Sequence, residues 1–155
     1  MLFTVNNTFC ITVEPDVINR WSRMEQRMHN AGLDSVYKWK ASTPQDLQDQ
    51  FDSRLSKLQC ACAQSHINIY KHMVEHNLEY AFILEDDACF DKNWLEKLRQ
   101  FNHNDTFDAV FLNCSEPETP INTWVKCKNQ YLTGAYIISL RGANTHFGRV
   151  SGLLL

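Results

Sequence analysis

The sequence predicts an α/β fold in which a mixed sheet is flanked by helices, and three observations lead to that prediction. Short β-rich runs alternate with longer segments whose apolar residues recur every three or four positions. The run at residues 80–84 is almost wholly apolar, as expected for a strand that is buried on both faces. The 155 residues are 44% hydrophobic, which suffices for one core, so we expect residues 1–155 to form a single domain.

The first strand, helix and strand are expected before residue 42. Residues 8–13 are β-rich, and the Glu14-Pro15 pair predicts the start of a helix, because proline suits a first helical turn. Residues 17–31 carry apolar side chains at helical spacing, and Gly32 stands where a glycine cap would end the helix. Residues 35–41 alternate apolar and polar side chains, which predicts a second strand. The apolar helix positions are Val17, Ile18, Trp21, Met24 and Met28.

The middle of the chain predicts a loop followed by helix, strand and helix. Residues 42–56 are polar and aperiodic, which indicates a surface connection containing at most a helical turn. Residues 58–76 have helical spacing and lead into the apolar strand at residues 80–84. Residues 91–101 predict an amphipathic helix with Asp91 as its N-cap.

The last third of the chain predicts three strands and a short helix. The strands are expected at residues 109–112, 123–127 and 135–140, and the helix from Arg141. The sequence contains no internal repeat and no low-complexity tract. Strands and helices alternate along the whole chain, as in an α/β domain.

Charge and hydropathy argue against several kinds of partner. The net charge is -3 and the pI about 6.0, with scattered basic residues, so we expect no nucleic acid and no anionic lipid surface as partner. The longest apolar run, residues 81–84, is far shorter than the roughly 20 residues that a membrane-spanning helix needs. The first residues also lack the pattern of a secretion signal. We therefore expect neither a membrane span nor a leader in this sequence.

The six cysteines contain no Cys-x-x-Cys pair, and we expect reduced, mostly buried thiols. Cys60 and Cys62 are two positions apart on a predicted helix, so they point to different sides and do not easily clamp one ion. Sequons for N-glycosylation begin at Asn6, Asn104 and Asn113, and they would matter only in a secretory compartment.

Three consecutive acids, Glu85, Asp86 and Asp87, follow the apolar strand at residues 80–84. Carboxylates at the end of a buried strand are costly unless something neutralises them. The carboxyl end of a sheet is where α/β proteins bind ligands, and strand alternation would place Glu85 and Asp87 on one face. Mg²⁺ and Mn²⁺ prefer oxygen ligands and bridge one or two carboxylates to substrate phosphates, such as the diphosphate of a nucleotide sugar. The alternative is a solvated turn whose acids cap the next helix.

The residues around these acids resemble glycosyltransferase family 25, which contains bacterial lipooligosaccharide galactosyltransferases and collagen galactosyltransferases. The similar blocks occur in the family's order and span residues 9–147. They are Ile11–Val13 with Arg20 and Arg23, Cys62–His66 with Tyr70, Tyr80–Phe90, Phe107–Leu112, and Thr133–Ser139 with Gly142 and Ala143. Three positions depart from the family pattern: Thr12 replaces an asparagine, Gln59 an acid and Ala61 a glycine.

The resemblance implies a GT-A-like (Rossmann-like) fold and an inverting transfer of a hexose from a nucleotide sugar. The commonest donor in the family is UDP-galactose, bound with Mn²⁺ or Mg²⁺ at the acidic motif, and the acceptor would be a glycan, a glycolipid or a protein. The chain ends soon after the block at residues 133–139, so we expect it to be C-terminally short and to lack part of the acceptor side. We expect a cytoplasmic location, in a bacterium or a virus-infected host cell, ahead of the lumen of the endoplasmic reticulum.

The resemblance also suggests roles for the three acids. Asp87 and Glu85 are the expected catalytic residues and metal ligands, and the metal would stabilise charge on the departing diphosphate. Asp86 is an expected contact to the ribose or to the metal's second coordination position. The general base that activates the acceptor stays unassigned. Glu116, like Glu118, is a weak candidate, because a solvated loop explains both acids at least as well.

Further residues are expected to contact the donor. Ser65 and His66 would face the acidic motif and orient the acids or the donor, whereas a helix histidine more often has a packing role. Arg20, with Arg23, could bind the diphosphate, although an exposed helix face explains both arginines equally well. Thr133 and Tyr136 would line the sugar pocket; an aromatic residue at the start of a strand is more often part of the core. 

Two other functions remain open from the sequence. One is a non-catalytic, shortened relative that binds a nucleotide sugar or a partner without turnover. The other is a metal-dependent phosphoryl-transfer protein, because such proteins also hold Mg²⁺ with acids that follow an apolar strand. Sites of the second kind ordinarily need a Ser or Thr strand end and a lysine loop, which we do not find in suitable places. 

Overall fold

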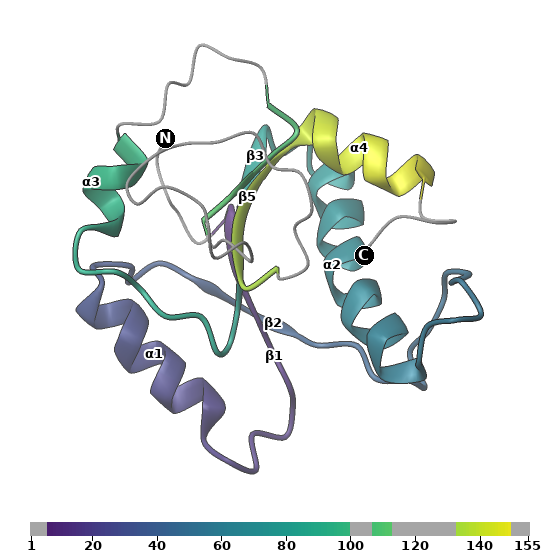
Figure 1. The fold of residues 1–155 in the computed structure, drawn as a ribbon, viewed down its shortest axis with the longest axis horizontal. Coiled ribbons are helices and arrows are strands. Elements are labelled where there is room, and N and C mark those ends of the chain that lie inside the picture. The colour runs from purple at the N-terminus through teal and green to yellow at the C-terminus, as the bar shows by residue number, and fades with distance from the viewer. Residues whose placement is uncertain (1–5, 100–106, 113–132, 150–155) are drawn as a thin grey trace.

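The computed structural model describes residues 6–99, 107–112 and 133–149, and it is built on a mixed sheet with helices on both faces (Figure 1). The described sheet has five strands in the order β2-β1-β3-β5-β4. The strands are β1 (Thr8–Thr12), β2 (Tyr37–Lys40), β3 (Tyr80–Glu85), β4 (Ala109–Phe111) and β5 (Ala135–Ser139). The helices are α1 (Arg20–Asn30), α2 (Lys57–Glu75), α3 (Trp94–Arg99) and α4 (Leu140–Arg149). The predicted α/β class with a mixed sheet is confirmed.

Strand directions divide the sheet into two parts. β1 pairs in parallel with both β2 and β3, whereas β5 is antiparallel to β3 and to β4. β3 therefore lies in the middle of the sheet, between β1 and β5. The predicted strand at residues 123–127 lies outside the described residues.

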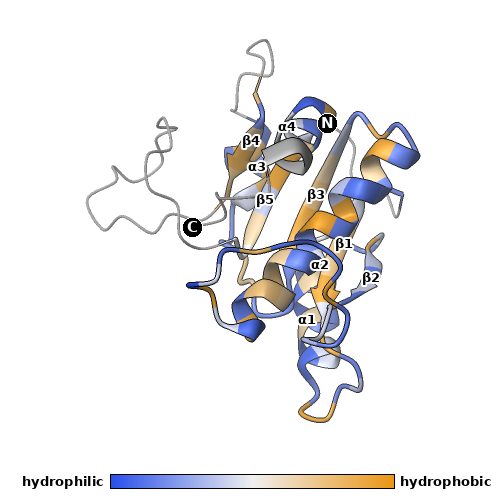
Figure 2. Cartoon of the chain, turned by 90° about the vertical axis from the view of Figure 1, so that its right-hand side faces the viewer, coloured by the Kyte–Doolittle hydropathy of each residue, from blue (hydrophilic) through white to orange (hydrophobic). Residues whose placement is uncertain are grey.

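Each face of the sheet has its own apolar core, because successive strand side chains point to opposite faces. On the face covered by α2 and α4, Phe9 and Ile83 pack with Tyr70 and Met73. On the face covered by α1 and α3, the core gathers residues from the alternate strand positions: Cys10, Met24, Met28, Phe82, Leu84, Leu98 and Ile137. Figure 1 shows α1 and α3 on one side of the strands and α2 and α4 on the other. Figure 2 shows that β3 is largely hydrophobic, whereas the helices carry hydrophilic residues as well.

The first helix begins later than the sequence predicts. We expected it at Glu14-Pro15, but α1 begins at Arg20. The carboxylate of Asp16 accepts hydrogen bonds from the backbone N–H groups of Arg20 (2.7 Å) and Trp21 (3.0 Å), and thereby caps the helix from outside it. The two apolar residues assigned to the helix, Val17 and Ile18, instead lie in the loop and are 80% and 58% exposed.

The end of α1 agrees with the prediction. Gly32 has φ 73°, the left-handed conformation that favours glycine after a helix. Its N–H donates to the carbonyl of His29 at 3.0 Å, and the N–H of Leu33 donates to that of Met28 at 2.9 Å. These two bonds satisfy carbonyls that the end of the helix leaves open.

The connection between β2 and α2 is held by polar residues of α2. No helix or strand is assigned between residues 41 and 56, which agrees with the predicted surface connection. The side chain of Gln64 is fully buried, and its carbonyl accepts from the backbone N–H groups of Gln48 (3.0 Å) and Asp49 (3.1 Å). Lys71 donates to the Asp49 carboxylate at 2.8 Å. These bonds fasten the connection along α2.

Helix α2 starts at a capping box, in which Ser56 and Gln59 each bond the other's backbone N–H. Helix α3 is shorter at its start than predicted, because it begins at Trp94 and Asp91 precedes it. The Asp91 carbonyl accepts from the Trp94 N–H at 3.2 Å, and its carboxylate pairs with Lys97. Asp91 thus bonds the first turn without being its N-cap.

The described cysteines are free thiols, but they are not mostly buried as expected. Cys10 and Cys60 are buried, whereas Cys62 and Cys89 are exposed. Burial raises the pKa of Cys10 to about 12, so this thiol stays protonated.

Among the helices described, none is long and apolar enough to cross a membrane.

Candidate functional site

The carboxyl ends of β1 and β3 lie side by side at the point where the strand order reverses. From β1 the chain passes through α1 to β2 on one side, and it then returns through α2 to β3 on the other side of β1. Open α/β sheets bind their ligands in the crevice at such a switch point. Thr12 ends β1 here, and Glu85 ends β3.

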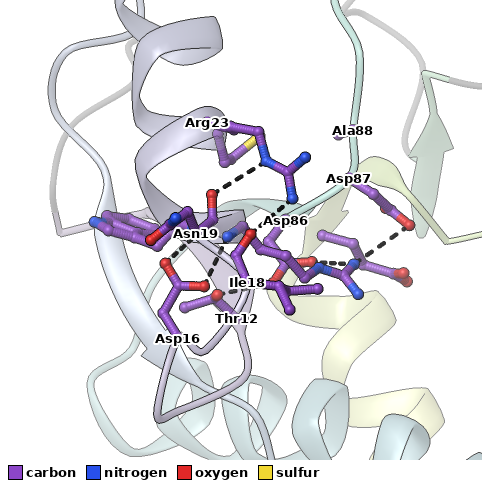
Figure 3. Close-up of polar contacts among 12 residues, drawn as sticks. Thr12, Asp16, Ile18, Asn19, Arg23, Asp86, Asp87 and Ala88 are labelled. Atoms are coloured by element: carbon purple, nitrogen blue, oxygen red, sulfur yellow. Dashed lines mark hydrogen bonds and ion pairs between the residues drawn. The ribbon is translucent and has the colours of Figure 1, made fainter.

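Asp86 is the buried member of the acidic motif, with 6% of its surface exposed. The hydroxyl of Thr12 donates to its Oδ2 at 2.8 Å (Figure 3). The guanidinium of Arg20 forms an ion pair with its Oδ1. A charge next to a buried carboxylate offsets the cost of removing that carboxylate from water. Both oxygens of Asp86 are therefore engaged by protein groups.

Asp87 is the exposed member of the motif. Its side chain is 68% exposed, and its Oδ2 lies 3.6 Å from the Arg20 guanidinium that also holds Asp86. The Arg20 side chain is itself 37% exposed, so it is partly open to solvent beside the Asp87 carboxylate. An accessible carboxylate and an accessible guanidinium thus stand together at the switch point.

The backbone of the acidic turn is held by Arg27, a residue to which the sequence assigned no role. Its Nε donates to the Ala88 carbonyl at 3.0 Å and its NH2 group to the Asp86 carbonyl at 2.8 Å. A bond from the Ala88 N–H to the Glu85 carbonyl, at 3.0 Å, closes the turn. The spacing in the sequence could have identified Arg27, because it follows Arg20 by two helical turns and therefore lies on the same face of α1.

Glu85 lies apart from the other two acids. Strand alternation predicted that it would share a face with Asp87, but β3 ends at Glu85 and the turn begins there. Its carboxylate accepts from the Thr133 hydroxyl at 2.5 Å and lies 3.4 Å from Nε2 of His66. The hydrogen bond with His66, and then that with Thr133, lowers the pKa of Glu85 although burial opposes the shift. Glu85 is therefore an ionised acceptor.

His66 connects this carboxylate to the core. Its Nδ1 lies 2.7 Å from the hydroxyl of Tyr136, which in turn lies 2.8 Å from the hydroxyl of Tyr70. Burial raises the pKa of Tyr70 to about 12 and that of Tyr136 well above its ordinary value, so both phenols stay protonated. Tyr136 is 1% exposed and lies beneath the site as a core residue. Its expected contact with a sugar is not part of this arrangement.

Two other predicted donor contacts bond elsewhere in the structure. The buried hydroxyl of Ser65 donates to the Ala61 carbonyl at 2.9 Å and accepts from the Ser42 N–H at 2.8 Å, so it holds the loop after β2. Arg23 donates to the carbonyls of Asn19 (3.2 Å) and Ile18 (2.9 Å) in the loop before its own helix (Figure 3). 

Of the other predicted site residues, Thr133 joins Glu85 and His66 at the site. Glu116 and Glu118 lie outside the described residues. The site that the structure assembles from the prediction thus has two parts, the Arg20 side with Asp86 and Asp87 and the His66 side with Glu85 and Thr133.

The positions of the three acids bear on the predicted metal site. Glu85, Asp86 and Asp87 do not bring three carboxylate oxygens together; in the part of the chain that the structure describes, the group of three potential ligands within 4.8 Å of one another is Cys62, His66 and Glu85. Mg²⁺ and Mn²⁺ are often held by one or two carboxylates, with water and substrate phosphate completing the shell. The exposed carboxylate of Asp87 fits that mode, and the pairing of Asp87 with Glu85 stays a prediction.

Cys62 was missed as a component of this site. It precedes His66 by one helical turn, and the residue is exposed. Desolvation, together with the negative charges of Glu85 and Asp87, raises the pKa of the Cys62 thiol. The sequence signal was the spacing of the two side chains, because residues four apart on a helix face the same way.

Comparisons with known proteins agree with the resemblance found in the sequence. The model of the family described as glycosyltransferase family 25 (LPS biosynthesis protein) matches residues 26–149. Procollagen galactosyltransferase 1-B of Xenopus laevis is 33% identical over an alignment of 102 residues, and the match covers 57% of this chain and 17% of that protein. Procollagen galactosyltransferase 2 of Homo sapiens is 26% identical over an alignment of 114 residues, and the match covers 64% of this chain and 18% of that protein. The matched part is thus less than a fifth of the length of these relatives.

Proposed function

The chain belongs to glycosyltransferase family 25, and we propose that it binds a nucleotide-sugar donor and transfers the donor's hexose to an acceptor hydroxyl. The observation that carries the proposal is the pair of accessible groups at the switch point, the Asp87 carboxylate beside the Arg20 guanidinium. Galactose, carried by UDP, is the proposed hexose, because the similar curated proteins are named as galactosyltransferases. The acceptor would be a glycan, a glycolipid or a protein.

Arg20 and Asp87 would meet the donor's diphosphate in different ways. The guanidinium of Arg20 can donate its free N–H groups to phosphate oxygens while it keeps its ion pair with Asp86. Asp87 would supply a carboxylate oxygen to Mn²⁺ or Mg²⁺, a cation that neutralises charge on the diphosphate when it is bound. Asp86, whose oxygens are both engaged, holds Arg20 in place.

Glu85 would bind a hydroxyl of the donor. Its ionised carboxylate is 28% exposed and keeps free lone pairs beside its bonds to Thr133 and His66. A hydroxyl of the ribose or of the hexose could donate to it. The acceptor hydroxyl would attack the opposite face of the sugar, which inverts the anomeric carbon. We assign no general base, and Glu116 is the candidate that the sequence offers.

Calorimetric titration of the full chain tests the donor site. UDP-galactose, with UDP-glucose as comparison, is titrated with and without Mn²⁺ into the wild type, Asp87→Ala and the control Glu79→Ala. Glu79 is an exposed acid that directly precedes β3, at the end of the strand opposite to the site. We expect metal-dependent binding in the wild type and the control, and a loss of at least about tenfold in affinity, near 1.4 kcal/mol, in Asp87→Ala.

Two outcomes would count against the proposal. If folded wild type bound neither donor, the donor site would be wrong, and if Asp87→Ala bound as the control does, Asp87 would have no part in it. Donor binding without hydrolysis or transfer to any acceptor would instead indicate a non-catalytic relative. Membership of the family argues against the phosphoryl-transfer alternative that the acidic motif alone left open.

A further inference from the structure

Three side chains with different ligand atoms converge on the His66 side of the site. Cys62 and His66 project from α2, and Glu85 ends β3. The Cys62 sulfur, a ring nitrogen of His66 and a carboxylate oxygen of Glu85 all lie within 4.8 Å of one another. We propose that these three residues form a binding site for Zn²⁺, separate from the carboxylate of Asp87 that the donor's cation would use.

The chemistry of the three ligand atoms selects zinc. Zn²⁺ binds cysteine sulfur, histidine nitrogen and carboxylate oxygen, whereas Mg²⁺ and Mn²⁺ prefer sites made of oxygen alone. Metal–ligand bonds of about 2.0–2.2 Å in a tetrahedron place nitrogen and oxygen about 3.3–3.6 Å apart. His66 Nε2 and Glu85 Oε1 are 3.4 Å apart, so two of the ligands already have this separation.

The helix places the other two ligands on one face. Cys62 and His66 are four residues apart on α2, so both side chains face the end of β3. His66 is 3% exposed while Cys62 is exposed, which leaves an entrance for the ion from solvent on the Cys62 side. Three protein ligands with one open side are typical of zinc sites that keep a water in the fourth position.

Further contacts hold two of the ligands in orientation. A histidine that binds a metal commonly uses its second ring nitrogen in a hydrogen bond. His66 Nδ1 lies 2.7 Å from the Tyr136 hydroxyl. Without the ion, Nε2–H of His66 donates to Glu85; with zinc bound, the proton would reside on Nδ1 and be donated to Tyr136, which frees the Nε2 lone pair for the ion. The Thr133 hydroxyl holds Glu85 in the same way, at 2.5 Å. Binding forms Zn–S, Zn–N and Zn–O bonds and releases the Cys62 thiol proton to water, with no change of oxidation state.

Cobalt substitution and zinc competition test the proposal on the reduced full chain. Co²⁺ bound to a thiolate shows a sulfur-to-cobalt charge-transfer band, and Zn²⁺ affinity is measured by competition with a chelator dye. The variants are Cys62→Ser and His66→Gln, and Cys89→Ser is the matched control because Cys89 is also an exposed, free thiol. We expect the band in the wild type and in Cys89→Ser, its absence in Cys62→Ser, and zinc affinity weaker by at least about tenfold in both ligand variants.

Either of two results would exclude the zinc site. A wild type without the cobalt–thiolate band, or zinc binding no tighter than in Cys62→Ser, would exclude it. Cys62→Ser changes an exposed residue and is expected to keep the fold, so its result does not depend on whether His66→Gln folds. Asp87→Ala is expected to retain zinc binding. Glu85 belongs to both proposals, but Asp87→Ala removes a ligand of the donor's cation alone and Cys62→Ser a ligand of zinc alone. Failure of the zinc site can therefore be distinguished from failure of the donor site.

Discussion

Asp86 is a buried carboxylate, and its neighbours offset the free-energy cost of removing its charge from water. It is 6% exposed, and Arg20 and Thr12 supply an ion pair and a hydrogen bond to its two oxygens. Removing one partner of a buried pair costs more than the pair contributes, because the other charge is left desolvated. Arg20 therefore contributes to the stability of the fold as well as to the site.

We predict that Arg20→Gln destabilises the protein by about 2 kcal/mol, less than for a fully buried pair because Arg20 is 37% exposed. Urea unfolding measures the change. Arg23→Gln is the matched control, since Arg23 is on the same helix and bonds only loop carbonyls in the described contacts. The control is expected to change stability by less than about 0.5 kcal/mol. Equal losses of unfolding free energy in the two variants would show that the Arg20–Asp86 ion pair does not stabilise the protein.

At the scale of elements, helix α4 packs unusually close to the segment that leads into β4. A Cβ atom added at Gly142 would lie 2.2 Å from the Asp108 carbonyl oxygen and 2.8 Å from its carbon. That same carbonyl accepts a hydrogen bond from the Ser139 N–H at 3.0 Å, which limits its freedom to move. The absence of a side chain at residue 142 thus allows β4, β5 and α4 to meet.

Gly142→Ala is expected to destabilise the protein by about 1–3 kcal/mol, because backbone would have to shift to admit the methyl group. The control is Gly134→Ala, where an added Cβ meets nothing within 4 Å. The midpoints of urea unfolding for the two variants give the comparison. If Gly134→Ala proved as damaging as Gly142→Ala, close packing of α4 would not be the cause.

At the scale of the whole molecule, β3 is the element around which the rest is built. It lies between β1 and β5, and Ala81, Phe82, Ile83 and Leu84 are fully buried because helices cover both faces of the sheet. β2 differs from it, since it pairs only with β1 in the described sheet and its four residues are exposed or half-buried. Stability should accordingly fall from the middle of the sheet toward β2.

Native-state hydrogen exchange read by mass spectrometry measures this gradient. The amides of β3 are expected to exchange about a hundredfold or more slowly than those of β2, because opening β3 requires both cores to separate. Similar rates in the two strands would show that the sheet opens as one unit. Tyr136 lies on the neighbouring strand β5, and its buried side chain bonds His66 at the site. We therefore expect the amides of β5 to exchange slowly as well.

Much of the fold could be predicted from the sequence, because periodicity, caps and apolar runs are local signals. The apolar run before Glu85 identified the central strand, and Gly32 marked the end of the first helix. The start of that helix was wrong because a side chain outside the helix, Asp16, caps it at Arg20. A cap made by a residue four positions upstream leaves no periodic signal.

For the site, the sequence by itself determined which segment carries the acids and that a helix, now α2, carries His66 toward them. Only the tertiary structure decided how they are used. Asp86 became buried because Thr12 and Arg20, more than 60 residues earlier in the chain, reach it. Glu85 separated from its two neighbours because the strand ends there and Thr133 and His66 lie on the other side. Local patterns specify elements, whereas partners distant in the chain meet only when the sheet and its two helical layers have packed.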